Sequence, residues 1–216
     1  REVSAGLETY CPQLNLDLED LDFADLGAVE IPFGNPEPVL SKVKQATEAV
    51  LALGLKPLML GGEHSISSGA VEAVAQRHPG LVLVQLDAHA DLRDNWLGAR
   101  HSHACAMRRC LEVLPSQTLL QLAIRSGTRE EFTELHESGR LMPSIDALQQ
   151  ALAPLQGKPI YLTVDLDWFD PSVLPGTGTP EPGGYHWPDF ASLIAMLREH
   201  HPVSYTHLTL PTIREV

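Results

Sequence analysis

The sequence predicts an α/β fold with a mainly parallel sheet flanked by helices. Helical and strand patterns alternate along most of the 216 residues, which is typical of such a sheet. The segment Leu81–Leu86 (LVLVQL) is apolar almost throughout, as expected of a strand that is buried on both faces. No internal repeat, long linker or low-complexity tract interrupts the alternation. We therefore expect one α/β domain.

The predicted elements of the first half begin with a helix over residues 40–51, where apolar side chains recur at three- and four-residue spacing. Gly54 provides its stop. A short strand over 57–60 then runs into a pair of glycines, and a helix over 65–76 follows. The buried strand over 81–86 completes this half.

The second half repeats the alternation. Thr128 and Glu131 are spaced as a capping box, which predicts where one of its helices begins. The predicted helices cover residues 103–113, 128–136, 144–152 and 188–200, and the predicted strands cover 119–124 and 160–164.

The composition restricts the partners of the chain. It has 28 acidic and 15 basic residues, a net charge of −13 at neutral pH. Such a chain is repelled by phosphate backbones and anionic lipids, so we expect neither nucleic acid nor membrane as a partner. No apolar run approaches the ~20 residues of a membrane span, and the first residues do not resemble a signal peptide. The three cysteines form no C-x-x-C pair, so we expect a cytoplasmic protein.

Acidic residues and histidines follow three of the predicted strands. The motifs are GGEHS (61–65), DAHAD (87–91) and DLDWFDP (165–171). Side chains at alternate positions of extended backbone point to one side, and the carboxyl ends of parallel strands meet at one edge of the sheet. The predicted cluster therefore has four carboxylates and two imidazoles, from His64, Asp87, His89, Asp91, Asp165 and Asp167.

Four clustered carboxylates cannot all stay ionised unless cations neutralise them. Oxygen-rich ligation with some imidazole and no thiolate favours two Mn²⁺ ions, with Fe, Co or Ni as alternatives. Two such ions would supply a hydroxide nucleophile at neutral pH. Each motif alone also has a structural interpretation: DAHAD as a solvated loop, Glu63 as a helix cap, and Asp170-Pro171 as a turn. The three motifs together favour the metal site, because burying acids without a purpose is costly.

In this order and at these strand ends, the three motifs resemble the ureohydrolases, the family of arginases and agmatinases. The resemblance extends from about residue 4 to residue 202. It implies a three-layer α/β/α sandwich and a binuclear Mn²⁺ centre. One ion would be held by His64, Asp87, Asp91 and Asp165, and the other by Asp87, His89, Asp165 and Asp167. Asp87 and Asp165 would bridge the ions, and Asp91 would hydrogen-bond the bridging hydroxide.

Two further residues lie in segments that are similar to the family, and the resemblance assigns a role to the first of them. His103 stands where the family has a histidine that carries a proton to the leaving amine, a task suited to a group that titrates near neutrality. Arg125, in a segment similar to a G-I-R-S strand end, is expected to anchor carboxylates within the sheet.

The loop after DAHAD (LRDNWLG) and the segment GTGTPEPGG are more similar to agmatinases than to arginases. The resemblance thus implies hydrolysis of agmatine to putrescine and urea, in a homotrimer or homohexamer. A guanidinobutyrase is an alternative, because Arg93 would suit a carboxylate-bearing guanidino acid. A non-catalytic metal-binding relative is another. A polyamine deacetylase with a single Zn²⁺ is disfavoured by the four carboxylates.

The C-terminal segment departs from the family. The acidic D-x-x-E segment, whose Glu receives the substrate guanidinium, is missing from this sequence. Residues 203–212 resemble one reading frame of a transposon-end sequencing adapter. We therefore predict an incomplete ureohydrolase domain over 1–202 and a non-native tail over 203–216. A chain of this kind is expected to bind Mn²⁺ weakly and to hydrolyse its substrate slowly.

Overall fold

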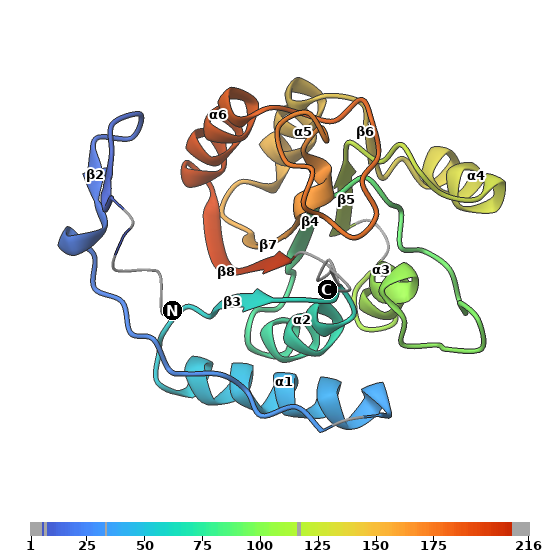
Figure 1. The fold of residues 1–216 in the computed structure, drawn as a ribbon, viewed down its shortest axis with the longest axis horizontal. Helices are drawn as coiled ribbons and strands as arrows, with labels where there is room; N and C mark the ends of the chain where they lie inside the picture. Colours follow the sequence, from blue (N-terminus) through green and yellow to red (C-terminus); the bar gives the residue numbers. More distant parts are fainter. Residues whose placement is uncertain (1–5, 7, 33, 116–117, 209–216) are drawn as a thin grey trace. The chain divides into compact units, whose positions relative to one another are not determined.

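The computed structural model describes residues 6, 8–32, 34–115 and 118–208. The chain divides into two units, Arg1–Glu30 and Ile31–Val216. In the first unit, the strands β1 (Tyr10–Cys11) and β2 (Leu16–Asp17) form a short antiparallel pair (Figure 1). A single 3-10 turn, Leu18–Asp20, follows them.

The second unit is built on a six-stranded sheet with the order β3-β8-β7-β4-β5-β6. Every pairing between neighbouring strands of this sheet is parallel. The predicted α/β fold with a mainly parallel sheet is therefore confirmed. The strands are β3 (Leu58–Gly61), β4 (Val82–Leu86), β5 (Leu119–Leu122), β6 (Leu141–Met142), β7 (Pro159–Asp165) and β8 (His201–Leu208).

Helices cover both faces of the sheet, which completes the three layers. Figure 1 shows α1, α2 and α3 on one side and α5 and α6 on the other. Each side has its own apolar core, the first containing Val71 and Met107 and the second Leu148 and Leu193. No helix in the described part of the chain is long and apolar enough to cross a membrane. The helices are α1 (Pro36–Ala52), α2 (Ile66–Arg77), α3 (Ala106–Cys110), α4 (Arg129–Ser138), α5 (Ile145–Leu152) and α6 (Trp187–Arg198).

The helix predicted over 103–113 is shorter in the structure. A 3-10 turn covers His103–Cys105, and α3 ends at Cys110. The reason is a backbone exchange with the loop after β4. Arg108 N–H donates to the Asp91 carbonyl, while the Ala104 carbonyl accepts from Arg93 N–H. Arg108 N–H and the Ala104 carbonyl, which a continuous helix would use for its own hydrogen bonds, therefore bind this segment to the loop that carries DAHAD.

Most of strand β8, from Val203 to Leu208, lies in the segment predicted to be a non-native tail. It pairs with β3 on one side and with β7 on the other. Val203 and Leu208 are buried in it. Residues 203–208 therefore form part of the sheet, whereas 209–216 lie outside the described residues. The origin of the tail and the domain boundary at residue 202 stay predictions.

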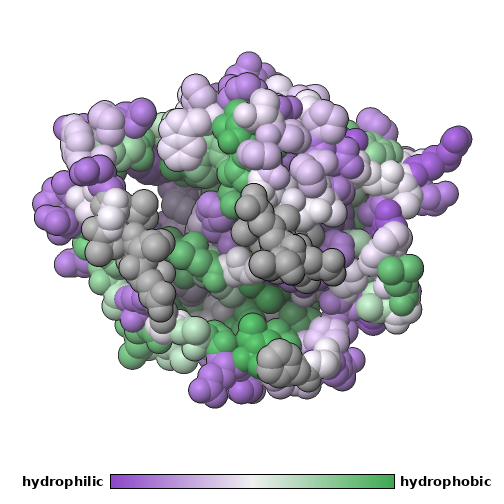
Figure 2. Space-filling view, in the orientation of Figure 1, coloured by the Kyte–Doolittle hydropathy of each residue, from purple (hydrophilic) through white to green (hydrophobic). Residues whose placement is uncertain are grey.

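The first strand of the sheet is exposed. Leu58 and Leu60, which share one face of β3, are 66% and 75% exposed. Among the described residues, β3 also has a neighbour only on its β8 side. Figure 2 shows hydrophobic surface in the part of the molecule where Figure 1 places β3. Unpaired strand edges of this kind favour association with other chains.

Candidate metal centre

The predicted ligands follow the carboxyl ends of three parallel strands. His64 follows β3, the DAHAD segment follows β4, and Asp165 and Asp167 lie at the end of β7. Strands β4 and β7 are neighbours, in register from Val82 and Ile160 onward. The structure brings all six predicted ligands together at this edge of the sheet and places them on one cavity of about 220 Å³.

His64 is surrounded by carboxylates. Its Nδ1 atom lies 2.9 Å from Asp91 Oδ2, 3.0 Å from Asp87 Oδ2 and 3.7 Å from Asp165 Oδ2. The Nε2 atom of the same ring lies 3.1 Å from the hydroxyl of Thr163, which fixes the orientation of the ring. The ring is buried. Thr163 thus contacts Nε2 of His64, and Nδ1 faces the carboxylates.

A second group forms around His89. Its Nδ1 atom lies 3.0 Å from Asp167 Oδ2 and 3.6 Å from Asp87 Oδ1. Asp167 is itself held by Ala88 N–H, which donates to Oδ1 at 3.0 Å, and by the hydroxyl of Thr179, which donates to Oδ2 at 3.1 Å. Asp87 therefore faces both histidines, one with each carboxylate oxygen.

The backbone of DAHAD is bent to make this arrangement. Asp91 has φ +54°, in the left-handed region that residues other than glycine rarely adopt. Strain of this kind persists where surrounding contacts enforce it, and it concentrates at functional sites. The bend turns the Asp91 carboxylate back toward His64.

The charges within the cluster shift its pKa values. Burial and the charge of Asp87 raise the pKa of Asp165 to about 8 and that of Asp91 to about 6. Burial opposes protonation of His89, but hydrogen bonds to Asp167 and Asp87 outweigh it and raise its pKa to about 11. For Asp87, burial is outweighed by His64 and His89, which lower its pKa. Without cations, the cluster thus holds protons that the same groups would lose in water.

The side chains suit two divalent ions. His64, Asp87 and Asp91 offer ligand atoms within 4.8 Å of one another, and so do Asp87, His89 and Asp167. Among the described residues, His64 Nδ1 is buried without a hydrogen-bond partner, although carboxylate oxygens lie 3 Å away. A ligand atom of a metal has this environment. Oxygen-rich ligation with imidazole suits divalent ions, and the choice of Mn²⁺ among them stays a prediction.

His103 lies on the wall of the same cavity. Its Nδ1 atom is 3.3 Å from Glu63 Oε1, and the side chain is 36% exposed. The hydrogen bond to Glu63, opposed by partial burial, raises the pKa of His103. Glu63 also accepts from Ser65 N–H at 3.0 Å. Ser65 is the N-cap of α2 and no side chain of the described residues makes a cap hydrogen bond there, so Glu63 does not have the capping role that its sequence position allowed. Glu63 thus contacts both the residue that begins α2 and the predicted proton carrier.

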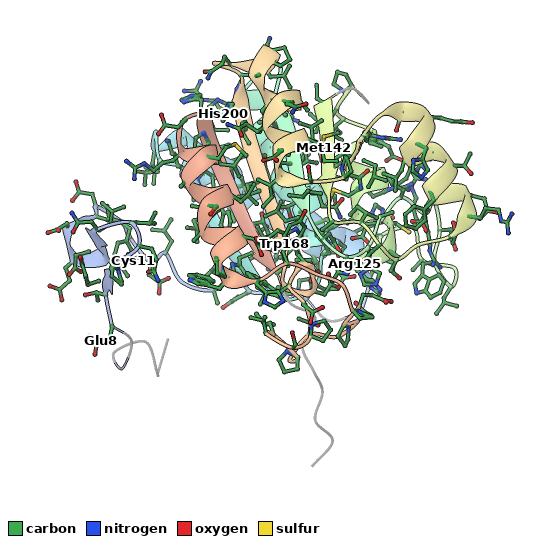
Figure 3. The ribbon with its side chains drawn as sticks, turned by 90° about the horizontal axis from the view of Figure 1, so that it is seen from above. Glu8, Cys11, Arg125, Met142, Trp168 and His200 are labelled. Carbon is green, nitrogen blue, oxygen red and sulfur yellow. The ribbon has the colours of Figure 1, made fainter. Side chains whose placement is uncertain are left out.

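Arg125 has a structural role, but its partners differ from the prediction. Its guanidinium donates to backbone carbonyls, including those of Asp167 at 2.6 Å and Glu181 at 2.8 Å, and within the described residues it has no carboxylate partner. Figure 3 shows Arg125 and Trp168 at the same end of the sheet. Arg125 therefore ties the loop 176–184 to the end of β7, beside the cluster.

Trp96 and Glu131 belong to the cavity wall, although the sequence did not predict this. They line the cavity with Arg93. The Arg93 guanidinium lies over the Trp96 ring at 4.0 Å, and Arg93 Nε is 3.4 Å from Glu131 Oε2. The capping-box pattern identified Glu131 as a cap only, and no local signal indicated that the same side chain reaches Arg93.

Known proteins resemble this chain over most of its length. The agmatinase of Bacillus subtilis (strain 168) is 38% identical over 187 residues, which cover 85% of this chain and 64% of that protein. A mitochondrial guanidino acid hydrolase of Homo sapiens is 35% identical, covering 85% of this chain and 56% of its own. The chain thus spans less than two thirds of the length of these relatives.

Solved structures show the same fold. The crystal structure of an agmatine ureohydrolase of Thermoplasma volcanium superposes with a TM-score of 0.85 at 32% identity, covering 99% of this chain and 74% of that one. The arginase family matches residues 1–206. A family match over nearly the whole sequence, together with the same fold in a solved relative at 32% identity, leads to one conclusion: the chain belongs to the arginase family.

Proposed function

We propose that this chain carries the metal centre of a Mn²⁺-dependent ureohydrolase that converts agmatine to putrescine and urea. The observation that carries the proposal is the pair of ligand groups that share Asp87 at the carboxyl ends of the strands. Relatives named agmatinase, at 38% identity, support the same substrate. Trimeric or hexameric assembly in the cytoplasm, for polyamine synthesis, is part of the proposal and follows from the family resemblance.

The ligands would divide between two ions. His64 and Asp91 would serve one ion, and His89 and Asp167 the other. Asp87 would bridge them, as would Asp165, whose Oδ2 lies 3.7 Å from His64 Nδ1. When bound, the ions would lower the pKa of water and so supply hydroxide at neutral pH.

The protein side chains perform the remaining tasks. His103 Nδ1 is engaged by Glu63, which leaves Nε2 to deliver a proton to the departing amine. A raised pKa keeps His103 protonated nearer neutrality, as a proton donor requires. The net charge of −13 of the whole chain also favours the approach of a cationic substrate.

The substrate preference rests on Arg93. A guanidino acid, such as guanidinobutyrate, would need a cation for its carboxylate, and a human relative is named for such substrates. Arg93 is the cation of the described cavity wall placed for this role, but Glu131 contacts it at 3.4 Å and balances its charge. Agmatine is therefore the first substrate to test, and guanidinobutyrate is the second.

Metal binding tests the proposal most directly. The chain is stripped with EDTA and titrated with Mn²⁺ by calorimetry, with circular dichroism to verify folding. Two Mn²⁺ per chain are expected for the native sequence and for Asp146→Asn, an exposed control in α5. Asp87→Asn is expected to lose both ions. A folded chain that binds no Mn²⁺ would overturn the proposal. Elemental analysis of the chain before EDTA treatment is the companion measurement, and a single Zn²⁺ per chain would favour the deacetylase alternative.

Urea release separates an enzyme from a non-catalytic relative. The Mn²⁺-loaded chain is incubated with agmatine, guanidinobutyrate or arginine, and urea is measured over long times because slow turnover is expected. Release from agmatine above that of the Asp91→Asn variant supports the proposal. Two bound ions without any urea would favour the non-catalytic alternative.

A further inference from the structure

Two glutamines lie buried in the sheet behind the metal cluster. Gln85 of β4 and Gln121 of β5 are register partners in neighbouring parallel strands, and both are 0% exposed. Alternate residues of a strand share a face, so Gln85 lies on the same face as Asp87. Amide side chains are seldom buried completely, and those that are need hydrogen-bond partners.

The partners fix which way each amide points. Gln121 Nε2 donates to the Ala90 carbonyl at 2.9 Å and to Gln85 Oε1 at 2.6 Å. Gln85 Nε2 donates to Asp87 Oδ2 at 2.7 Å and to the His89 carbonyl at 3.1 Å. Carbonyls and an ionised carboxylate can only accept, so the NH₂ group of each glutamine must face them. The hydrogen bonds therefore run in one direction, with Gln121 donating to Gln85 and Gln85 donating to Asp87.

These contacts reach the ligands in two ways. One end holds the carboxylate of Asp87, the residue that both ligand groups share. The other contacts hold the carbonyls of His89 and Ala90, and so the bent backbone that carries Asp91 at φ +54°. Groups that orient metal ligands in this way commonly affect metal affinity strongly when they are removed.

We infer that Gln85 and Gln121 are positioning residues, an amide pair that presets Asp87 and the DAHAD bend for two divalent ions. The inference rests on the proposed function, because it concerns the same metal centre. Gln85 acts directly on the bridging carboxylate, whereas Gln121 acts through Gln85 and through the Ala90 carbonyl. Neither side chain touches the substrate.

Mn²⁺ titration of methionine variants tests this inference. Methionine has nearly the length of glutamine but donates no hydrogen bond. We expect Gln85→Met to weaken Mn²⁺ binding by roughly 10–100-fold and Gln121→Met to weaken it less. In the double variant, the loss should be smaller than the product of the two single losses, because the residues act in series.

The matched control is Tyr161→Phe. It removes a buried hydrogen bond between β7 and Thr206 of β8, in the same sheet, but contacts none of the six ligands in the described structure. Its Mn²⁺ affinity should stay within about twofold of the native value. Thermal unfolding in EDTA measures the loss of stability of every variant, so that a merely structural effect is seen without metal.

The outcomes separate this inference from the proposed function. A native chain that binds no Mn²⁺ overturns both. Two ions bound by the native chain, with unchanged affinity in folded Gln85→Met or Gln121→Met, overturns only the positioning role. Equal weakening in Tyr161→Phe also overturns it, because any buried polar loss would then have the same effect. If Gln85→Met does not fold, Gln121→Met decides between these results.

Discussion

Asp87 is the residue on which the centre depends most. It is buried, it faces both His64 and His89, and it belongs to both ligand groups. Asp167, by contrast, contacts only His89 of the two histidines and belongs to one ligand group in the described structure. A shared carboxylate cannot be removed without disturbing both groups, whereas an unshared one affects a single group.

We therefore expect Asp87→Asn to lose both Mn²⁺ ions and Asp167→Asn to keep one tightly bound ion. Asparagine preserves the shape of the side chain but removes the charge and one acceptor oxygen. Elemental analysis after gel filtration measures the ions per chain. Equal stoichiometry in the two variants would contradict the bridging role of Asp87.

Arg93 and Glu131 provide a second prediction at this scale. Glu131→Gln should leave the charge of Arg93 unbalanced, and Arg93→Met should leave that of Glu131 unbalanced. A free Arg93 can attract the carboxylate of guanidinobutyrate, so the rate for guanidinobutyrate relative to agmatine should rise in the first variant and fall in the second. We expect a rise of roughly 10-fold, which corresponds to about 1.4 kcal/mol of transition-state stabilisation. Glu130→Gln, in the same helical turn, is the control. The measurement is the ratio of the initial rates of urea release from the two substrates. Identical ratios in all variants would show that Arg93 does not recognise the carboxylate end of the substrate.

At the scale of elements, the sequence predicted the features that depend on neighbouring residues, such as helix caps and buried strands. The Thr128–Glu131 capping box is confirmed, and strand β4 is buried as its apolar sequence indicated. The cluster followed from the alternation at strand ends, because parallel strands bring these ends to one edge. Contacts between distant segments could not be predicted locally. The exchange between α3 and the DAHAD loop, and the donors of Gln121, depend on which strands become neighbours.

The cap of α4 also supports the cavity wall. Thr128 Oγ1 accepts from Glu131 N–H at 3.2 Å, and Glu131 in turn accepts from Thr128 N–H and, across the loop, from Leu92 N–H. Thr128→Ala should lower the free energy of unfolding by ~1 kcal/mol. Thr133→Ala, which loses only an exposed hydroxyl contact within the same helix, should cost less. Urea denaturation measures the free energy of unfolding of both variants. Equal losses would show that the Thr128 cap stabilises the protein no more than the hydroxyl contact of Thr133.

Strand β8 offers a test of whether the predicted tail is part of the fold. Val203 is 3% exposed and belongs to the core on the α1–α3 side of the sheet. If β8 is formed in solution, Val203→Ala should lower the free energy of unfolding by about 1–3 kcal/mol, through lost burial and the cavity left behind. Val173→Ala, at a position that is 43% exposed, is the control. An unchanged denaturation midpoint for Val203→Ala would place residue 203 outside the folded core.

For the whole molecule, we expect the cluster to couple folding to pH and to metal binding. The metal-free fold keeps a proton on Asp165, with a pKa of about 8, that the unfolded chain loses near its ordinary value of 3.8. His89, with a pKa of about 11 against an ordinary 6.5, likewise keeps a proton that unfolding releases above pH 6.5. The folded state thus binds more protons between these values, so its stability falls as pH rises.

We therefore expect the metal-free chain to lose stability from pH 5 to pH 8, by ~1.4 kcal/mol per pH unit for each group whose protonation differs. Mn²⁺ binds the deprotonated ligands, so its affinity and the stability it adds should increase over the same range. Thermal unfolding at a series of pH values, in EDTA and in excess Mn²⁺, measures both trends. Asp165→Asn should flatten the metal-free curve, because asparagine binds no proton and carries no charge. Parallel curves with and without Mn²⁺ would contradict the coupling, since the protons of the cluster would then not be displaced by the metal.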